Sequence, residues 1–321
     1  MKIAEEVTFG AGLLNRLAEI RGNQGAIEDR IKKGRILPLW RGKPLLRPDL
    51  DGRQSLAFLS ADHAVLQDRL DRCVYLGDTE TSPVFAVDIS DLTPEGELPG
   101  ADEFLDLSLQ HLTGTPEDHS FGELRGVMAQ LTQLEAEIAA TARGILEWHR
   151  IHRFCANCGE MSDVIMSGWQ RRCNSCGRMH FPRTDPVVIM LITHGNSALI
   201  GRNENWPPRM YSLLAGFMEP GETIEAATRR EVFEETGVRV DRVDYLASQP
   251  WPYPASLMIG TRGLATTTDI TLDPIELEGA LWVSREDMLE VFAGRHPDIA
   301  AARKGSIAHF LLTNWLADRL D

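Results

Sequence analysis

The segment from Gly216 to Val238 constrains the fold of this chain more than any other. It carries three glutamates, Glu231, Glu234 and Glu235, at positions i, i+3 and i+4. On a helix with 3.6 residues per turn, these positions fall within roughly a 100° arc. The three carboxylates would therefore share one face, where like charges repel one another. A divalent cation would remove that repulsion, and oxygen ligands suit Mg²⁺ or Mn²⁺.

Two further features accompany the acidic face. Arg230 precedes the first glutamate, and Glu222 lies just before the expected helix, which runs from about Thr223 to Thr236. An Arg–Glu pair at this place would stiffen the junction between loop and helix. Gly237 supplies the C-terminal stop of the helix.

The alternative interpretation is a solvated acidic face on a surface helix, which usually explains two neighbouring glutamates. Here it would also have to explain the flanking glycines and the apolar Val232 and Val238. At average composition, such a pattern of fixed identities and apolar positions arises with odds on the order of 10⁻⁸ to 10⁻⁹ per window. We therefore reject the solvated face.

The segment resembles the signature box of the Nudix hydrolases without a departure. The matching positions are Gly216, Glu222, Arg230-Glu231-Val232, Glu234-Glu235 and Gly237-Val238. The resemblance implies a loop–helix–loop on an α/β/α sandwich, with two or more divalent ions that bind a diphosphate and activate a water. It makes the three clustered glutamates metal ligands, one of them serving as base, and makes Glu222 the partner of Arg230.

The sequence around this box predicts the rest of an α+β domain over residues 184–321, an α/β/α sandwich with a mixed sheet. Apolar runs predict strands, and an apolar stripe predicts a final helix. The expected strands are Pro186–Ile192, Ala198–Gly201, Leu257–Leu264 and Gly279–Val283, and the helix runs through Ile307 and Trp315.

Two matched cysteine pairs precede this domain. Each pair has a two-residue gap and a trailing glycine, and fourteen residues separate the pairs; the four residues are Cys155, Cys158, Cys173 and Cys176. Two such turns facing each other make a tetrahedral Cys₄ site that suits Zn²⁺. Because four thiolates fill the coordination shell, this metal would be structural. The matched spacing disfavours a redox pair or two disulfides, and we interpret the nearby His180 as incidental.

We expect this zinc ribbon to span residues 150–183. Before it, a stripe of apolar residues predicts a linking helix over residues 123–149. Residues 1–122 give weaker signals of a mixed α+β N-terminal domain, with strands at Arg35–Trp40, Ser55–Leu59 and Val84–Ile89. The isolated Cys73 begins an apolar run, so we expect a core residue rather than a nucleophile.

A proline-rich run after the box narrows the family. It reads Ser248-Gln249-Pro250-Trp251-Pro252-Tyr253-Pro254-Ala255-Ser256, which predicts a rigid, non-helical loop. The run resembles the SQPWPFPxS signature of the NADH pyrophosphatases, with Tyr253 where phenylalanine is usual. The cysteine ribbon before the Nudix domain is similar to theirs as well. The resemblance is firm from about Trp148 onward and looser over the first 120 residues.

This resemblance implies a homodimer and further site residues. Phe217 would stack on the nicotinamide ring, and Phe181 would be supplied by the other subunit, although it could also be plain core. Glu276 would complete the metal site, against the alternative of a solvated carboxylate at a strand end. The remaining implied substrate contacts are Ala215, Ser248, Gln249, Trp251, Tyr253, Ser256 and Ala308. The N-terminal domain would aid dimer assembly.

Composition restricts the class of protein. The chain has 321 residues and a net charge of −14, which repels nucleic-acid backbones and anionic substrates unless bound metal receives the phosphates. No apolar stretch of about 18 residues predicts a membrane helix, and the acidic start is unlike a signal peptide. We therefore expect a cytoplasmic protein.

The leading functional prediction is metal-dependent hydrolysis of the diphosphate of NAD(H) to NMN(H) and AMP. Three alternatives stay open. The first is removal of NAD caps from RNA 5′ ends, and the second is a broader substrate such as ADP-ribose or a dinucleoside polyphosphate. The third is a non-catalytic zinc ribbon that binds nucleic acid. The basic residues available for that binding are Arg171, Arg172, Arg178 and Arg183.

Overall fold

The computed structural model describes residues 4–94 and 106–320. The chain divides into two compact units. The C-terminal unit comprises Met1–Gly10, Asp185–Trp251 and Ser256–Asp321, and the N-terminal unit comprises Ala11–Thr184 and Pro252–Ala255. Residues 4–10 therefore cluster with the distant end of the sequence.

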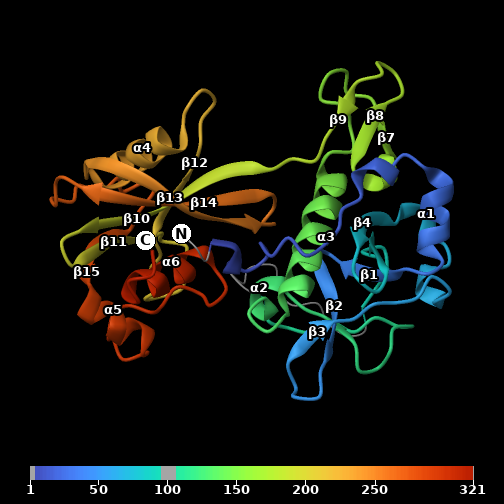
Figure 1. Ribbon diagram of the computed structural model, residues 1–321, viewed down its shortest axis with the longest axis horizontal. Coiled ribbons are helices and arrows are strands. Elements are labelled where there is room, and N and C mark those ends of the chain that lie inside the picture. The colour runs from blue at the N-terminus through green and yellow to red at the C-terminus, as the bar shows by residue number, and fades with distance from the viewer. Residues whose placement is uncertain (1–3, 95–105, 321) are drawn as a thin grey trace. The chain divides into compact units, whose positions relative to one another are not determined.

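A six-stranded mixed sheet forms the centre of the C-terminal unit (Figure 1). Its strand order is β13-β14-β10-β11-β15, and β12 also pairs with β10. Only the β10–β14 pairing is parallel among these strands. The bounds are β10 (Asp185–His194), β11 (Ser197–Arg202), β12 (Leu214–Phe217), β13 (Val240–Trp251), β14 (Ser256–Ala265) and β15 (Gly279–Ser284).

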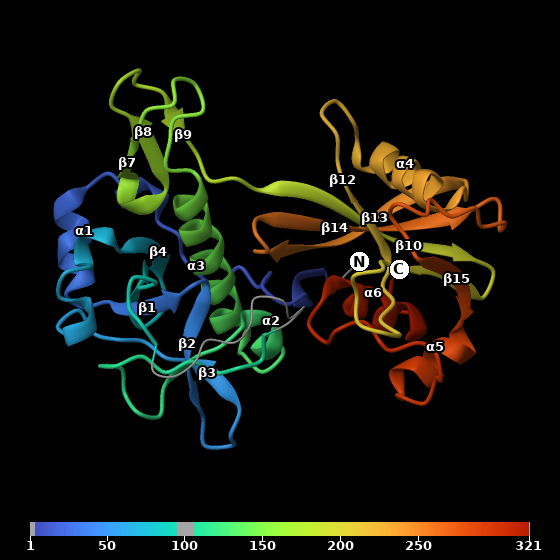
Figure 2. The ribbon, with the colours of Figure 1, turned by 180° about the vertical axis from the view of Figure 1, so that it is seen from behind.

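Alternate residues of β10 serve two different cores. Val188, Met190 and Ile192 pack with α4 (Ile224–Thr236) on one face of the sheet. Ile189 and Leu191 pack with α5 (Arg285–Phe292) and α6 (Ile307–Leu316) on the other face. Because side chains alternate across a strand, one apolar strand organises both layers, as Figures 1 and 2 show. The expected α/β/α sandwich is confirmed.

The N-terminal unit contains a second six-stranded sheet. Its order is β3-β2-β1-β5-β4, β6 pairs with β2, and β1 runs parallel to β5. Cys73 packs against its core, and burial raises the pKa of the thiol to about 12, as suits a core residue. The elements are α1 (Gln24–Ile31), β1 (Arg35–Trp40), β2 (Lys43–Pro48), β3 (Gln54–Leu56), β4 (Val74–Asp78), β5 (Pro83–Asp88) and β6 (Ser120–Phe121).

The helix expected over residues 123–149 is broken, so that prediction is wrong at its N-terminal end. The structure has a single turn, α2 (Leu124–Val127), followed by the long α3 (Gln133–Ile151). Thr132 begins α3 with a capping box, since its hydroxyl accepts from the Glu135 amide while the Glu135 carboxylate accepts from the Thr132 amide. The capping box satisfies two amides that a continuous helix would have bonded internally. The sequence signal Thr-x-x-Glu was therefore present.

A three-stranded sheet in the order β7-β8-β9 follows α3. Its strands are β7 (Ser162–Ile165), β8 (Gln170–Cys173) and β9 (Met179–His180). Short 3₁₀ turns occur at Ala4–Glu6, Ala18–Ile20, Ala64–Leu66, Leu70–Arg72 and Met166–Gly168. Within the described residues, no helix is both long and apolar enough to cross a membrane.

Candidate active site

Helix α4 and the segment before β15 bring three carboxylates together. The ligand oxygens of Glu231, Glu235 and Glu276 all lie within 4.8 Å of one another. The first two glutamates are one turn apart on α4 and are buried, whereas Glu276 is exposed. Its segment is anchored to the end of α4, because the Asp273 amide donates to the Glu235 carbonyl at 3.0 Å. The fold thus joins residues that are 41 positions apart in the sequence.

Glu235 has the most unfavourable surroundings of the three. The residue is 4% exposed, and its Oε2 has no hydrogen-bond partner among the described residues. Burial, followed by the charges of Glu231 and Glu276, raises the pKa of this carboxyl to about 8. A buried oxygen without a partner, aimed at two other carboxylates, fits a hard divalent cation. These residues are therefore suited to hold one.

Arg230 connects the box loop to the helix. Its guanidinium donates to both oxygens of Glu222 at 2.7 and 2.8 Å, to Glu231 at 2.9 Å and to the Phe217 carbonyl at 2.9 Å. This charge-assisted contact lowers the pKa of Glu222 to about 2. The pairing predicted between Glu222 and Arg230 is present, and it fixes the loop relative to the helix.

Glu234 takes a different place from the other box glutamates. It lies within 3.0 Å of the Arg230 guanidinium and its side chain is 56% exposed. It is outside the group formed by the other three carboxylates in the part of the chain that the structure describes. Of the four glutamates expected to hold metal, the structure brings three together and leaves Glu234 as a salt-bridge partner at the edge.

Gly216 is required by the position of Glu231. A Cβ atom added at Gly216 would lie 1.9 Å from Cδ of Glu231 and 2.2 Å from its Oε2. Because the atoms met are the end of the Glu231 side chain, any side chain at position 216 would force that carboxylate to move, and the glycine of strand β12 lets the carboxylate keep its place. The first glycine of the box thus has a steric role that sequence spacing alone did not reveal.

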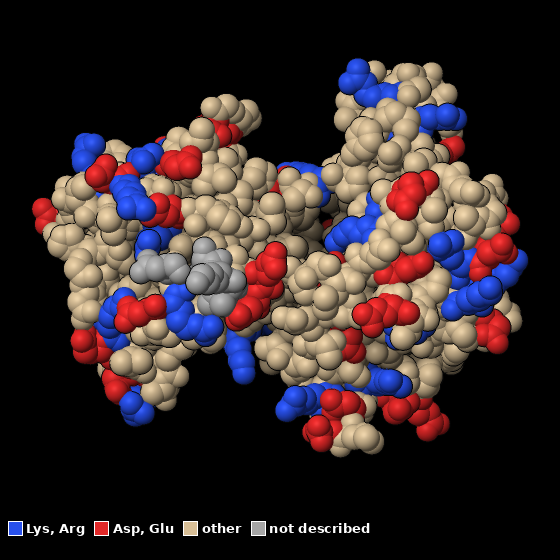
Figure 3. Space-filling view, in the orientation of Figure 1, with Lys and Arg blue, Asp and Glu red and all other residues tan. Residues whose placement is uncertain are grey.

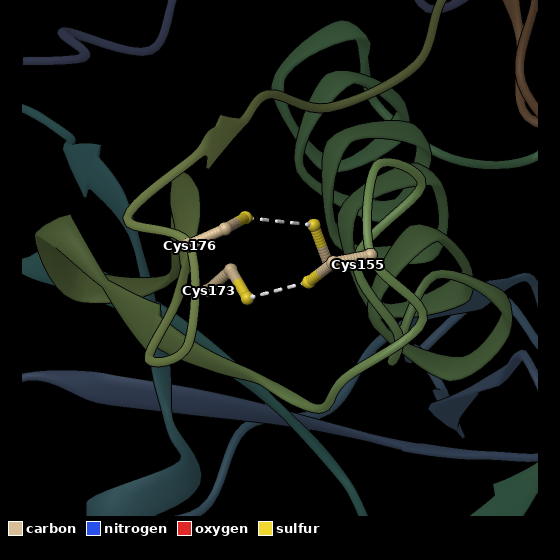
Figure 4. A group of neighbouring side chains, drawn as sticks. Cys155, Cys173 and Cys176 are labelled. Atoms are coloured by element: carbon tan, nitrogen blue, oxygen red, sulfur yellow. Dashed lines mark hydrogen bonds between the residues drawn. The ribbon is translucent and has the colours of Figure 1, made fainter.

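The four cysteines of the ribbon form a second, separate cluster (Figure 4). Their sulfurs lie 3.6 Å apart for Cys155 and Cys176 and 3.5 Å apart for Cys158 and Cys173. These distances are far longer than the ~2.05 Å of a disulfide, but close to the ~3.8 Å edge of a tetrahedron with Zn–S bonds of ~2.3 Å. The glycine after each pair has a φ of +81° or +72°, as the turn requires. This cluster is the site of a structural zinc ion, and within the described residues its metal-ligating group does not include His180.

Comparisons with known proteins agree with this arrangement. Residues 33–148 match an NADH pyrophosphatase-like rudimentary NUDIX domain, residues 150–181 an NADH pyrophosphatase zinc ribbon domain, and residues 182–306 a NUDIX domain. The chain is 36% identical to the NAD-capped RNA hydrolase NudC of Pseudomonas putida (strain GB-1) over 227 residues, which cover 70% of this chain and 77% of that protein. The chain belongs to the NADH pyrophosphatase family of Nudix hydrolases.

The matches to two human relatives cover only part of each relative's length. The chain is 44% identical over 200 residues to the NAD-capped RNA hydrolase NUDT12, covering 59% of this chain and 43% of that protein. It is 35% identical over 209 residues to the mitochondrial NAD(P)H pyrophosphatase NUDT13, covering 61% of this chain and 59% of that protein. The chain therefore spans less than two thirds of these relatives.

The substrate residues implied by the family resemblance occupy several different environments. Phe217 is 61% exposed at the end of β12, with the exposed Ala215 two positions before it on the same side of the strand. Phe181 is 62% exposed in the N-terminal unit, so it is not a core residue there. Ala308 lies on α6 and is buried in the core. Ser248 and Ser256 are half-buried on β13 and β14.

Gln249 is fully buried, and its side-chain amide forms hydrogen bonds with backbone groups. Its Nε2 donates to the carbonyls of Thr8 and Gly305 at 3.0 and 2.8 Å, and its Oε1 accepts from the Ile307 amide at 2.8 Å. Trp251, next but one on β13, has its ring 6.4 Å from that of Phe9. Gln249 therefore holds the N-terminal segment and the start of α6 in place.

Tyr253 clusters with the N-terminal unit rather than with the carboxylates. The guanidinium carbons of Arg125 and Arg143 lie 4.8 and 4.6 Å from the centre of its ring. The cationic groups favour the electron-rich face of an aromatic ring. Tyr253, at the aromatic position of the signature, thus contacts arginines of the N-terminal unit to which it belongs.

The basic patch expected on the ribbon is smaller than the sequence indicated. Arg171 is 6% exposed, and its guanidinium donates to the hydroxyl and the carbonyl of Ser162 at 2.9 and 2.6 Å. It supports the ribbon internally and is not available to a nucleic acid, so its inclusion in that patch was wrong. Alternation along β8 explains the difference, because the neighbouring Arg172 is exposed.

The zinc cluster yields a first prediction. Replacing the buried Cys173 by serine removes one of four soft ligands, so zinc content should fall well below one ion per chain and the ribbon should lose its fold. Metal analysis of purified protein with a protease-susceptibility assay measures both effects. Cys73→Ser is the matched control and should keep one zinc per chain. A zinc-free wild-type protein with an intact ribbon would contradict the assignment.

The contact between Gly216 and Glu231 yields a second prediction. Gly216→Ala should displace the carboxylate and weaken Mn²⁺ binding about tenfold or more, as altered support of a metal ligand does. Isothermal titration calorimetry measures the affinity. Gly279→Ala is the control, because a Cβ there meets only the Tyr211 hydroxyl at an ordinary 3.6 Å. Equal Mn²⁺ affinity in the two variants would contradict the role of Gly216 in placing the Glu231 carboxylate for the ion.

Proposed function

We propose that this protein hydrolyses the diphosphate bond of NAD(H) and releases NMN(H) and AMP, using Mg²⁺ or Mn²⁺. The observation that carries the proposal is the buried Glu235 oxygen without a partner, facing Glu231 and Glu276. Membership of the NADH pyrophosphatase family supplies the substrate class, since relatives carry the names NAD(P)H pyrophosphatase and NAD-capped RNA hydrolase.

The residues of the cluster would divide the work between them. Glu231, Glu235 and Glu276 would hold the divalent ions, and Glu234, which is paired with Arg230, would join them only if that contact opened. Bound ions would neutralise phosphate charge and lower the pKa of a coordinated water. Arg230 holds Glu222 and the Phe217 carbonyl, so it fixes the box loop at the edge of the site. Phe217 presents an exposed ring for stacking.

The reaction class is tested by product analysis. NADH, NAD⁺, ADP-ribose and NAD-capped RNA are each incubated with the protein and either Mg²⁺ or Mn²⁺, and the products are separated by chromatography. We expect NADH to give reduced NMN and AMP, with the reaction stopped by a chelator. If no diphosphate is cut with either ion, the proposal fails and the zinc ribbon as a nucleic-acid-binding module becomes the better hypothesis.

Glu235→Gln gives the sharpest mutational prediction. The amide keeps the shape but removes a negative charge and a metal ligand, so turnover should fall about 100-fold or more, which is about 2.7 kcal/mol of barrier. The melting temperature without metal should stay the same or rise, because the repulsion with Glu231 and Glu276 is relieved. Glu225→Gln, on the exposed first turn of α4, is the control and should keep full activity. Wild-type turnover in Glu235→Gln would refute the assigned role.

A second candidate, removal of NAD caps from RNA, is favoured by one observation. The N-terminal unit contains a cavity of about 500 Å³ lined by four arginines, Arg41, Arg125, Arg143 and Arg150, with Glu147 among them. Arg143 donates to the carbonyls of Gly42 and Pro252 and has no carboxylate partner among the described residues. Elsewhere, the face drawn in Figure 3 intersperses basic with acidic side chains. This cavity is therefore a place where an RNA phosphate would be attracted.

Substitution of arginines in this cavity distinguishes the two candidate activities. The double variant Arg41→Gln/Arg150→Gln should lower kcat/KM for NAD-capped RNA by about three- to tenfold at low salt and less at high salt, because lost phosphate contacts are salt-dependent. Hydrolysis of NADH should not change. Arg53→Gln, an exposed arginine on the turn before β3, is the matched control. Equal effects on both substrates would argue against RNA contact at this cavity.

We also infer a homodimer. Large apolar side chains on and beside the ribbon are exposed, namely Phe154, Met161, Val164 and Phe181 at 60%, 57%, 50% and 62%. Several large exposed apolar side chains on one short segment favour an interface there. Light scattering after size-exclusion chromatography tests this, and a monomer at micromolar concentration would refute it.

A further inference from the structure

A cavity of about 310 Å³ adjoins the carboxylate cluster in the C-terminal unit. Glu235 and Glu276 form its acidic side. The remaining wall is apolar and aromatic and consists of Trp206, Leu213, Leu214, Ile275 and Leu277, with Gly201, Asn203 and Ala215 between them. The exposed Phe217 does not line it, so the cavity and the ring of Phe217 offer two different apolar surfaces near the same carboxylates.

Two of the wall residues are large apolar side chains that remain exposed to solvent, wholly or in part. Ile275 is 88% exposed although it directly precedes Glu276, and Trp206 is only partly covered on a loop. Leaving such side chains in water forgoes the favourable free energy of burying them. No lysine or arginine is among the described residues that line the cavity, so its walls suit a planar, uncharged or cationic ring rather than a phosphate. Flat heteroaromatic bases stack well on tryptophan.

The loop that carries Trp206 is tied to the carboxylate segment. Asn203 Nδ2 donates to the Glu276 carbonyl at 2.9 Å, and the Trp206 amide donates to the Asn203 carbonyl at 3.1 Å. The Arg202 guanidinium donates to the Trp206 carbonyl at 3.1 Å. The position of the indole is therefore coupled through the backbone to the position of Glu276. A preformed wall of this kind lowers the ordering cost of binding.

The floor of the cavity is also constrained. A Cβ added at Gly201 would lie 2.7 Å from Cδ2 of Leu214 and 3.3 Å from Leu277. The glycine lets strand β11 approach both leucines, and it keeps the cavity open above them. The packing of β11 against Leu214 and Leu277 therefore determines the shape of the cavity floor.

We propose that this cavity binds the heteroaromatic base of one nucleotide half of the substrate, with Trp206 and Ile275 as its two apolar walls. This inference rests on the proposed function, because a dinucleotide diphosphate carries a base on each side of the bond that is cut. The diphosphate would lie at the carboxylates, and the other base would use a different surface, such as Phe217. Trp206 and Ile275 are then specificity-determining residues.

Direct binding tests the cavity without relying on turnover. Isothermal titration calorimetry with AMP and with NMN, each in the presence of Mg²⁺, is performed on the full-length wild-type protein, Trp206→Ala, Trp206→Phe and Ile275→Ser. We expect the Kd of one mononucleotide to rise about tenfold in Trp206→Ala, equivalent to about 1.4 kcal/mol. It should rise several-fold in Ile275→Ser and return near the wild-type value in Trp206→Phe. The mononucleotide affected tells which base, adenine or nicotinamide, occupies the cavity.

The controls separate this inference from other outcomes. Leu289→Ser, at an aliphatic residue that is 55% exposed on α5, should bind both mononucleotides as the wild type does. Unchanged binding of both mononucleotides in Trp206→Ala, or an equal loss of both that Trp206→Phe does not restore, would overturn the proposed cavity. A wild-type protein that shows the expected binding pattern but cuts no NADH would instead overturn the proposed function alone.

Discussion

Electrostatic repulsion among buried carboxylates governs the C-terminal unit. Glu231 and Glu235 lie one turn apart on α4 with 8% and 4% of their surface exposed, and Glu276 is brought against them. Burial alone disfavours the charged form of a carboxylate, and two neighbouring charges add to that cost. Among the described residues, Arg230 alone offsets it by an ion pair, and Arg230 contacts Glu231 but not Glu235. The fold therefore holds three carboxylates in an electrostatically unfavourable arrangement, which a bound cation would stabilise.

The sandwich architecture makes that arrangement possible. The apolar β10 fills a core on each of its faces, so α4 is held firmly although its outer side is acidic. The backbone bond from Asp273 to Glu235 then fixes the segment carrying Glu276 against the end of α4. Apolar packing on one side of α4 thus offsets the repulsion among carboxylates on its other side. The structure around a strained functional site must supply such stabilisation.

Local patterns predicted much of this molecule. Periodicity and capping signals gave α4 within one residue, because Thr223 and Gly237 set its ends, and β1 was predicted with its observed bounds. The cysteine spacing predicted the ribbon, since paired turns are local structures. In contrast, β13 and α5 were not foreseen, because β13 alternates irregularly across two register shifts and α5 is only eight residues long.

Contacts between distant residues account for most of what the sequence could not provide. The close approach of Glu231 to Gly216 and the bonds from Gln249 to Thr8 and Gly305 depend on tertiary structure, which no spacing rule encodes. The role of Glu276 came from a family resemblance, and only the structure shows its oxygen beside those of α4. Conversely, Arg171 is a basic residue of the kind that binds nucleic acid, but its guanidinium donates its hydrogen bonds to Ser162 inside the ribbon.

The two metal-ligating clusters divide soft from hard chemistry in one chain. Four thiolates complete a tetrahedral shell, so the ribbon offers stability and no open position for substrate. Three carboxylates leave a hard cation with positions to fill, and the adjoining cavity with Trp206 and Ile275 leaves room for a base beside them. Because the ligand types differ, each site selects its own ion.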